Sequence, residues 1–212
     1  MKNDIKYCLW DVGQTIYPYS LEPLDRWARS HTLRPEKYND THNIHMFDYK
    51  PYMQGKINFD TFCQDICLQY DIQYDTSIKP QINKALHRGI GPIYQDTVDI
   101  MHQLKSAKIT NCILSNALPI LSHTVPLEDL ISAEHRFTSY ELGYLKHSPE
   151  IFEATRAKLS CNFSQIMLVD DKAENISAAS KLGIVGILCR HDKAPIDLQQ
   201  IISPLISKQN TR

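Results

Sequence analysis

The sequence predicts an α/β fold in which helices cover both faces of a parallel sheet and a small helical unit is inserted after the first strand. Short, continuous apolar runs alternate with helical patterns along most of the 212 residues. Such runs are typical of strands that are buried on both faces of a parallel sheet. Between residues 17 and 90 the alternation stops, and helical patterns occur there without a convincing buried strand. A chain of this length can form one domain with an insertion of that size.

Apolar runs that end at a polar residue predict the strands of the sheet. The four main runs are residues 5–10, 111–114, 165–169 and 184–189, and residues 136–138 are expected to form a fifth, shorter strand.

Apolar residues at helical spacing predict the helices between these strands. They lie around residues 98–107, 151–159 and 176–182, the last ended by Gly183. The same spacing predicts helices around residues 21–31, 58–70 and 78–87 within the insertion. We expect most of the aromatic side chains of the insertion to pack its small core, with some lining a sugar-sized pocket.

Charge and composition exclude several classes of protein. Lys+Arg number 23 and Asp+Glu 24, a net charge of −1, so there is no broad basic field for nucleic acid. No apolar stretch approaches the roughly 18 residues that a membrane span needs. We therefore expect no nucleic-acid or membrane partner and a cytoplasmic location. The six cysteines are scattered singly, which favours reduced thiols, and Cys63 and Cys67 are expected to pack rather than bind metal.

Polar side chains follow three of the predicted strands, at the point where each strand ends. They are Asp11, Ser115 and the pair Asp170 and Asp171. Functional residues of parallel sheets cluster beyond the carboxyl ends of the strands, so we expect these side chains to lie together. Carboxylates brought together repel one another, and a hard cation such as Mg²⁺ relieves that repulsion. With Lys146 as a positive charge, the set has the groups that phosphoryl transfer requires.

Four segments carry these residues in order along the chain. They are residues 9–15 with Asp11, 113–116 with Ser115, 142–152 with Lys146, and 168–175 with Asp170 and Asp171. Together they resemble the four motifs of the haloacid dehalogenase-like (HAD) hydrolase superfamily, in the family's order and at ordinary spacings. The resemblance implies a Rossmann-like, three-layer core formed by residues 1–16 and 91–212. It also implies that residues 17–90 form the family's helical cap of the first type.

The resemblance assigns catalytic roles to Asp11, Ser115 and Lys146 and a phosphate-binding role to Asn116. Asp11 would be the nucleophile that forms an aspartyl-phosphate. Ser115 would hold the transferring phosphoryl group, with Asn116 near the same oxygens. Lys146 would neutralise charge on Asp11 and on the phosphoryl oxygens.

The resemblance also implies a Mg²⁺ site. Asp11 and Asp171 would ligate the metal directly, Asp170 would orient a metal-bound water, and Gly13 would contribute its backbone carbonyl. Phosphatases of the family usually carry a second Asp at the position of Gly13, which acts as general acid and then general base. Such a group contributes about 10²–10⁴-fold to a rate, so its loss slows turnover without abolishing it.

Several functions stay open at this point. The first is a Mg²⁺-dependent phosphatase of a small phosphorylated metabolite, acting as a monomer or homodimer. Some relatives with glycine at this position are still regarded as phosphatases, with sugar 1-phosphates among their proposed substrates. Anomeric or acyl phosphates, whose leaving groups need little protonation, would suit the site. Alternatives are a catalytically weak binding or regulatory protein, a metal-independent 2-haloacid dehalogenase, and a mutase, which normally needs the missing acid.

Overall fold

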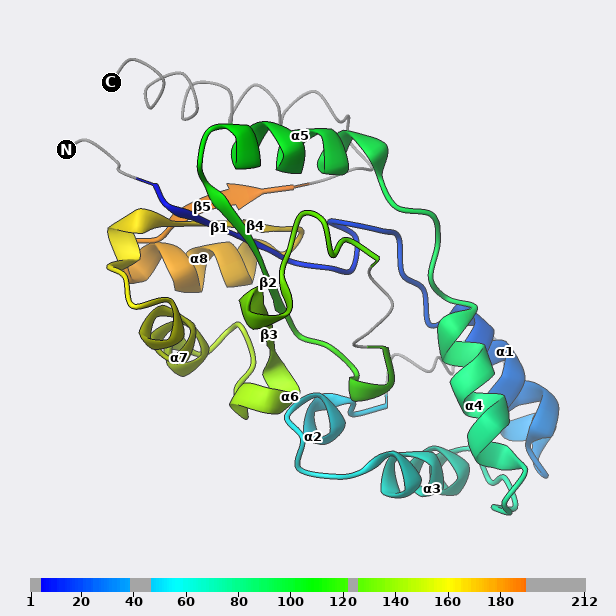
Figure 1. The fold of residues 1–212 in the computed structure, drawn as a ribbon. Helices are drawn as coiled ribbons and strands as arrows, with labels where there is room; N and C mark the ends of the chain where they lie inside the picture. The colour runs from blue at the N-terminus through cyan, green and yellow to red at the C-terminus, as the bar shows by residue number, and fades with distance from the viewer. Residues whose placement is uncertain (1–4, 39–46, 122–125, 190–212) are drawn as a thin grey trace.

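The structure is a computed structural model that describes residues 5–38, 47–121 and 126–189, and it shows a parallel sheet flanked by helices (Figure 1). Within the described residues the sheet has five strands in the order β3-β2-β1-β4-β5, and every neighbouring pair is parallel. The strands are β1 (Tyr7–Trp10), β2 (Thr110–Ser115), β3 (Arg136–Thr138), β4 (Ile166–Asp170) and β5 (Val185–Leu188). The predicted fold class and all five predicted strands are confirmed.

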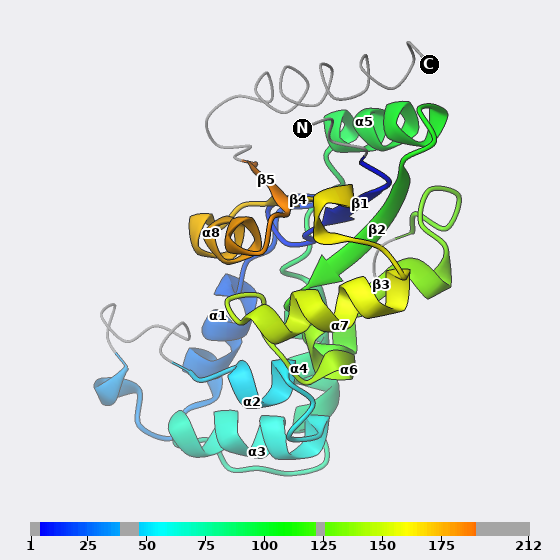
Figure 2. The ribbon, with the colours of Figure 1, turned by 90° about the vertical axis from the view of Figure 1, so that its left-hand side faces the viewer.

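Two hydrophobic clusters cover the two faces of the sheet, because successive side chains of a strand point to opposite faces. On one face, Trp10 of β1 packs in a cluster with Met101 of helix α5 (Gln95–Ser106). On the other, Leu9 packs in a cluster with Phe152 of helix α7 (Pro149–Leu159) and Ala179 of helix α8 (Ala173–Lys181). Figure 2 shows α5 on the opposite side of the sheet from α7 and α8.

The insertion after β1 forms a third hydrophobic cluster of its own, which includes Leu24, Phe62 and Ile82. Its helices are α1 (Glu22–His31), α2 (Lys50–Met53), α3 (Phe59–Gln69) and α4 (Ile78–His87). Both views place these helices beyond the carboxyl end of β2, which its arrowhead marks (Figures 1 and 2). The insertion therefore lies at the edge of the sheet where Asp11, Ser115 and Asp170 are found. The exact division into residues 17–90 and two core segments stays a prediction.

The described residues also contain shorter elements. They are helix α6 (Ser139–Leu142) and the 3₁₀ turns Pro35–Lys37, Pro119–Leu121, Ala133–His135 and Phe163–Gln165.

All six cysteines are free and buried, in line with the expectation of reduced thiols. Cys63 and Cys67 lie in the hydrophobic cluster of the insertion, where packing explains them. In the part of the chain that the structure describes, no helix combines the length and apolar character needed to cross a bilayer.

The two segments that connect the insertion to the sheet run side by side. Tyr19 and Ile90 form an antiparallel bridge, and the Ser20 amide donates to the Gly89 carbonyl at 2.9 Å. A Cβ atom at Gly89 would lie 2.0 Å from the Ser20 carbonyl oxygen, so only glycine permits this approach. Gly91 is equally confined, because its Cβ would lie 2.4 Å from the Pro18 ring.

Replacing Gly89 with alanine is therefore expected to destabilise the protein by about 1–3 kcal/mol, since backbone would have to move to accommodate the methyl group. The exposed neighbour Arg88 offers a control, and Arg88→Ala should change the free energy of unfolding by less than about 0.5 kcal/mol. Urea unfolding of both variants measures the difference. Equal stability of the two variants would contradict the close pairing of the connecting segments.

Candidate active site

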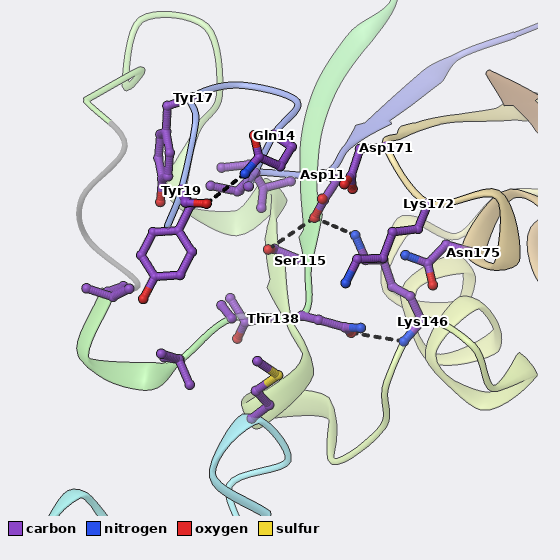
Figure 3. Close-up of a pocket in the computed structure, with 18 of the residues that line it drawn as sticks. Asp11, Gln14, Tyr17, Tyr19, Ser115, Thr138, Lys146, Asp171, Lys172 and Asn175 are labelled. Carbon is purple, nitrogen blue, oxygen red and sulfur yellow. Dashed lines mark hydrogen bonds and ion pairs between the residues drawn. The ribbon is translucent and has the colours of Figure 1, made fainter. Parts of the chain in front are cut away.

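The predicted site residues converge at the carboxyl edge of the sheet (Figure 3). Trp10 is in register with Ile113 of β2 and Val169 of β4, so the residues that follow on the three strands lie at one level. Asp11 comes directly after β1, Ser115 ends β2 and Asp170 ends β4. The Ser115 hydroxyl donates to Asp11 Oδ1 at 3.3 Å.

Lys146 lies in the segment between α6 and α7 and connects two of these carboxylates. Its side chain is 1% exposed, and Nζ lies 2.5 Å from Asp11 Oδ1 and 2.6 Å from Asp170 Oδ2. Asn116 fixes the backbone at this point, because its Oδ1 accepts a hydrogen bond from the Lys146 amide at 2.9 Å. Burial alone lowers the pKa of Lys146, but Asp11 and Asp170 more than offset it and the pKa is raised. The side chain is therefore a fixed positive charge.

Asp170 is fully buried, and both of its carboxylate oxygens are occupied by donors from the chain. Oδ1 accepts from the Lys172 amide at 2.8 Å and from Asn175 Nδ2 at 2.9 Å. Oδ2 accepts from Lys146 Nζ and from Asn175 Nδ2, the latter at 3.0 Å. Asp170 thus holds Lys146 in place. Asn175 in the first turn of α8 supports it and ties the loop after β4 to this helix, because its Nδ2 donates to both Asp170 oxygens.

Asp171 differs from Asp170 because it has a buried oxygen, Oδ1, without a hydrogen-bond partner among the described residues. Its pKa is raised to about 7, first by burial and then by the charges of Asp11 and Asp170. The three carboxylates each place one oxygen within 4.8 Å of the others. A buried acceptor without a donor, next to two further carboxylates, fits a hard divalent cation with oxygen ligands.

Gly13 lies two residues after Asp11 and lines the same cavity. Its backbone does not require glycine, since φ lies outside the left-handed region and an added Cβ would meet only Tyr19 Cβ, at 3.8 Å. The left-handed conformation of this turn falls on Gln14 instead, with φ of 60°, and the Gln14 amide donates to the Tyr17 carbonyl at 2.7 Å. No steric requirement of the backbone therefore explains the glycine at position 13. Its effect is chemical, because no side chain at this position can donate or accept a proton.

A cavity of about 390 Å³ opens over these groups. Its polar end contains Asp11, Ser115, Asn116, Lys146 and Asp171. The rest of its wall is mostly apolar and includes residues of the insertion. In Figure 3 Tyr17 and Tyr19 stand on the opposite side of the cavity from Asp171 and Lys146.

Removing the Lys146 ammonium should destabilise the fold, because two buried carboxylates lose their counter-charge. We expect Lys146→Met to lower the free energy of unfolding by about 3–5 kcal/mol, the usual effect of breaking a buried ion pair from one side. The exposed Lys172 provides the matched control, and Lys172→Met should shift stability by less than about 0.5 kcal/mol. Chemical unfolding near pH 8 measures both values. A Lys146→Met protein as stable as the control would show that the ion pairs contribute nothing.

Fold and site together define a class of protein, the α/β proteins with a parallel sheet and a carboxylate cluster at its carboxyl edge. Residues 5–183 match the model of one protein family, which is described as haloacid dehalogenase-like hydrolase. The chain belongs to that family, and the sequence-based resemblance to it is confirmed.

Several solved structures have a similar fold. A HAD family enzyme from Bacteroides thetaiotaomicron superposes with a TM-score of 0.74 and 21% identity, covering 93% of this chain and 98% of that chain. A predicted HAD-like family hydrolase from Porphyromonas gingivalis has a TM-score of 0.72 and 16% identity, over 94% and 98% of the two chains. A dehalogenase with an intermediate complex has a TM-score of 0.63 and 15% identity, over 93% and 97%. The Bacteroides enzyme has also been solved with magnesium and inorganic phosphate.

Proposed function

We propose that this protein is a Mg²⁺-dependent phosphatase that hydrolyses a small phosphorylated metabolite through an aspartyl-phosphate on Asp11. One observation carries the proposal. Asp11 is a buried carboxylate held between the Ser115 hydroxyl and the Lys146 ammonium at the base of a cavity. Next to it lies the Asp171 oxygen that has no hydrogen-bond partner in the described part of the chain. This is the arrangement that a carboxylate nucleophile acting on an anionic phosphoryl group requires.

The chain's own residues account for the two chemical steps. A carboxylate oxygen of Asp11 attacks phosphorus, and the leaving oxygen departs with the electron pair of the broken P–O bond. Water then attacks the phosphorus of the aspartyl-phosphate, which releases inorganic phosphate and returns Asp11 as a carboxylate. Throughout, Lys146 neutralises negative charge, and Ser115 can donate its hydrogen bond to a phosphoryl oxygen instead of Asp11.

Asp11, Asp171 and the Gly13 carbonyl would hold the Mg²⁺ ion. Asp170 contributes indirectly, because its oxygens are occupied by Lys146, Asn175 and the Lys172 amide. When bound, the ion would neutralise charge on the carboxylates and on the phosphoryl oxygens. The complex of the Bacteroides enzyme with magnesium and inorganic phosphate supports both the metal and the substrate class.

The insertion would act as the cap that encloses the substrate. Leu21 and Met53, which lie within residues 17–90, line the cavity together with the catalytic groups. This arrangement supports the assignment of the insertion as a cap, and it supports placing the chain with the helical-cap members of the family.

Phosphate release from a panel of monoesters and acyl phosphates, with and without Mg²⁺, tests the proposed function. We expect release that requires the metal and saturates with substrate. Saturable binding of inorganic phosphate without turnover of any compound would instead show a binding or regulatory protein.

Mg²⁺ itself should stabilise the protein, with a readout that is independent of activity. At 100 times the dissociation constant, bound Mg²⁺ contributes about 2.7 kcal/mol. For a chain of this size that raises Tm by roughly 5–10 °C. Asp171→Asn should abolish this increase and, because it removes one of three crowded carboxylates, raise the Tm of the metal-free protein. The exposed Asp65 is the control position, and Asp65→Asn should keep the full response. Equal Mg²⁺ shifts in both variants would contradict a metal site at Asp171.

A 2-haloacid dehalogenase is the second candidate, because Gly13 removes the acid that phosphatases use and the fold also matches a dehalogenase. The buried Asp171 oxygen, for which the described residues provide no donor, argues against it, since dehalogenation needs no metal. Release of chloride from 2-chloropropionate in the absence of Mg²⁺, by a protein that releases no phosphate from the monoester panel, would show that it is a dehalogenase.

A further inference from the structure

The wall of the cavity that faces away from the carboxylates is built from apolar and aromatic side chains. They are Tyr17, Tyr19, Leu21, Met53, Leu118 and Leu121. Leu118 and Leu121 come from the segment after β2, and the others from the segment after β1 and from the insertion, so several distant parts of the chain form one wall. A leaving group that extends from phosphorus into this space would contact mostly carbon.

Tyr19 adds little polarity to the wall despite its hydroxyl. That hydroxyl oxygen is shielded from solvent and has no hydrogen-bond partner among the described residues, so it is the ring that borders the cavity. Figure 3 shows the hydroxyl pointing away from Asp11. Gln14, which also lines the cavity, donates its side-chain NH₂ to the Tyr19 carbonyl at 2.6 Å.

The remaining polar side chains of this wall are engaged within the chain. Thr138 donates to Glu141 Oε2 at 2.7 Å, and Arg136 lies 3.7 Å from Glu128 Oε1. Ser20 Oγ accepts a backbone amide from the start of α1 at 3.1 Å. A sugar would have to bury several hydroxyl groups against this surface, and each buried hydroxyl without a partner costs about 1–3 kcal/mol. The wall therefore disfavours a polyhydroxylated leaving group.

Gly13 also disfavours a sugar as the leaving group. Glycine cannot protonate the departing oxygen, so a leaving group must be stable as an anion. A phenol, with a pKa of about 10 as in tyrosine, meets this requirement far better than an aliphatic or sugar hydroxyl. Aromatic rings also pack favourably against the two tyrosine rings.

We propose that the preferred substrate is a phosphate monoester of an apolar, aromatic hydroxyl compound, which is an aryl phosphate rather than a sugar phosphate. This assignment rests on the proposed phosphatase function. In the first step the bond between Asp11 oxygen and phosphorus forms, the P–O(aryl) bond breaks, and the phenolate leaves with the electron pair and takes its proton from water.

Steady-state kinetics with Mg²⁺ on four probes separate the effect of an apolar substituent from the effect of a good leaving group. Phenyl phosphate is apolar with a good leaving group, benzyl phosphate is apolar with a poor one, and glucose 1-phosphate and glucose 6-phosphate are polar. We expect kcat/KM for phenyl phosphate to exceed that for either sugar phosphate at least tenfold. Benzyl phosphate should share the KM of phenyl phosphate and have a much lower kcat. Sugar phosphates turned over as well as phenyl phosphate would overturn the assignment and leave the phosphatase intact, whereas no turnover of any probe or of acetyl phosphate would overturn both.

A variant of the wall tests the contact directly. Met53→Gln keeps the side-chain length and adds an amide, so it should reduce the preference for phenyl phosphate over glucose 1-phosphate about 5–10-fold. Met53→Leu should retain the preference. Leu68→Gln, at a side chain that is 81% exposed on α3, makes the same kind of polar change away from the cavity and should leave the preference as in the wild type. An unchanged preference in Met53→Gln would also overturn the assignment.

Discussion

Replacing Asp11 with asparagine is expected to reduce kcat for phosphate release by about 10⁴-fold or more, the scale seen when a hydrolase loses its nucleophile. The amide has nearly the shape of the carboxylate but lacks its negative charge and nucleophilicity. Lys146 keeps its second partner, Asp170, at 2.6 Å, so the site should stay folded. Phosphate release from phenyl phosphate in the presence of Mg²⁺ measures the loss.

The control for this variant is Asp65→Asn, which makes the same chemical change at an exposed position of α3. It should have wild-type kcat and KM. If Asp11→Asn retained a tenth or more of the wild-type kcat, Asp11 could not be the nucleophile.

Introducing an acid at position 13 is expected to increase activity. Gly13 has no left-handed φ, and the nearest atom to an added Cβ lies at ordinary contact distance, so Gly13→Asp should fold without strain. The new carboxyl group would lie at the cavity, where it can protonate a departing oxygen. The leaving group of benzyl phosphate needs a proton. For this substrate we expect kcat to increase by up to about 10²–10⁴-fold, the usual contribution of general acid catalysis. Phenyl phosphate should respond much less.

Gly13→Asn is the matched control for this gain, because asparagine has the same size and no proton to donate. It should give no increase with either substrate. An equal increase in the two variants would mean that position 13 acts through packing, and no increase in Gly13→Asp would mean that another group already supplies the proton.

Most of the sheet could be predicted because its strands are continuous apolar runs that end at polar residues. Residues 166–170, for example, are buried throughout and end at Asp170. Helices α2 and α6 could not be predicted in the same way. Each has only four residues, which is about one turn and too short to show a helical repeat.

The site was predicted unevenly. Asp11, Ser115 and Asp170 follow from their positions at strand ends, because parallel strands bring their carboxyl ends together. Lys146 is at no strand end, so the topology of the sheet does not place it next to these residues. Its contacts with both Asp11 and Asp170 depend on how the segment between α6 and α7 packs over the sheet, which no local pattern encodes.

The apolar wall was predicted only in part: some aromatic side chains of the insertion were expected to line a pocket, and Tyr17 and Tyr19 do so. Met53 and Leu118 line the same cavity although they are far apart in the chain. In the sequence, apolar residues at such positions look like ordinary core residues. Only the folded chain shows which of them border the cavity and which pack inside.

The proposed function requires that a phosphoryl group becomes transiently bonded to Asp11. The most direct measurement is rapid acid quenching of the wild-type enzyme during turnover of phenyl phosphate, followed by peptide mapping with mass spectrometry. We predict that the peptide containing Asp11 carries the mass of one phosphoryl group in the quenched wild type and not in Asp11→Asn. Phosphate release at full rate with no phosphoryl group on that peptide, or with the group on another residue, would contradict the account.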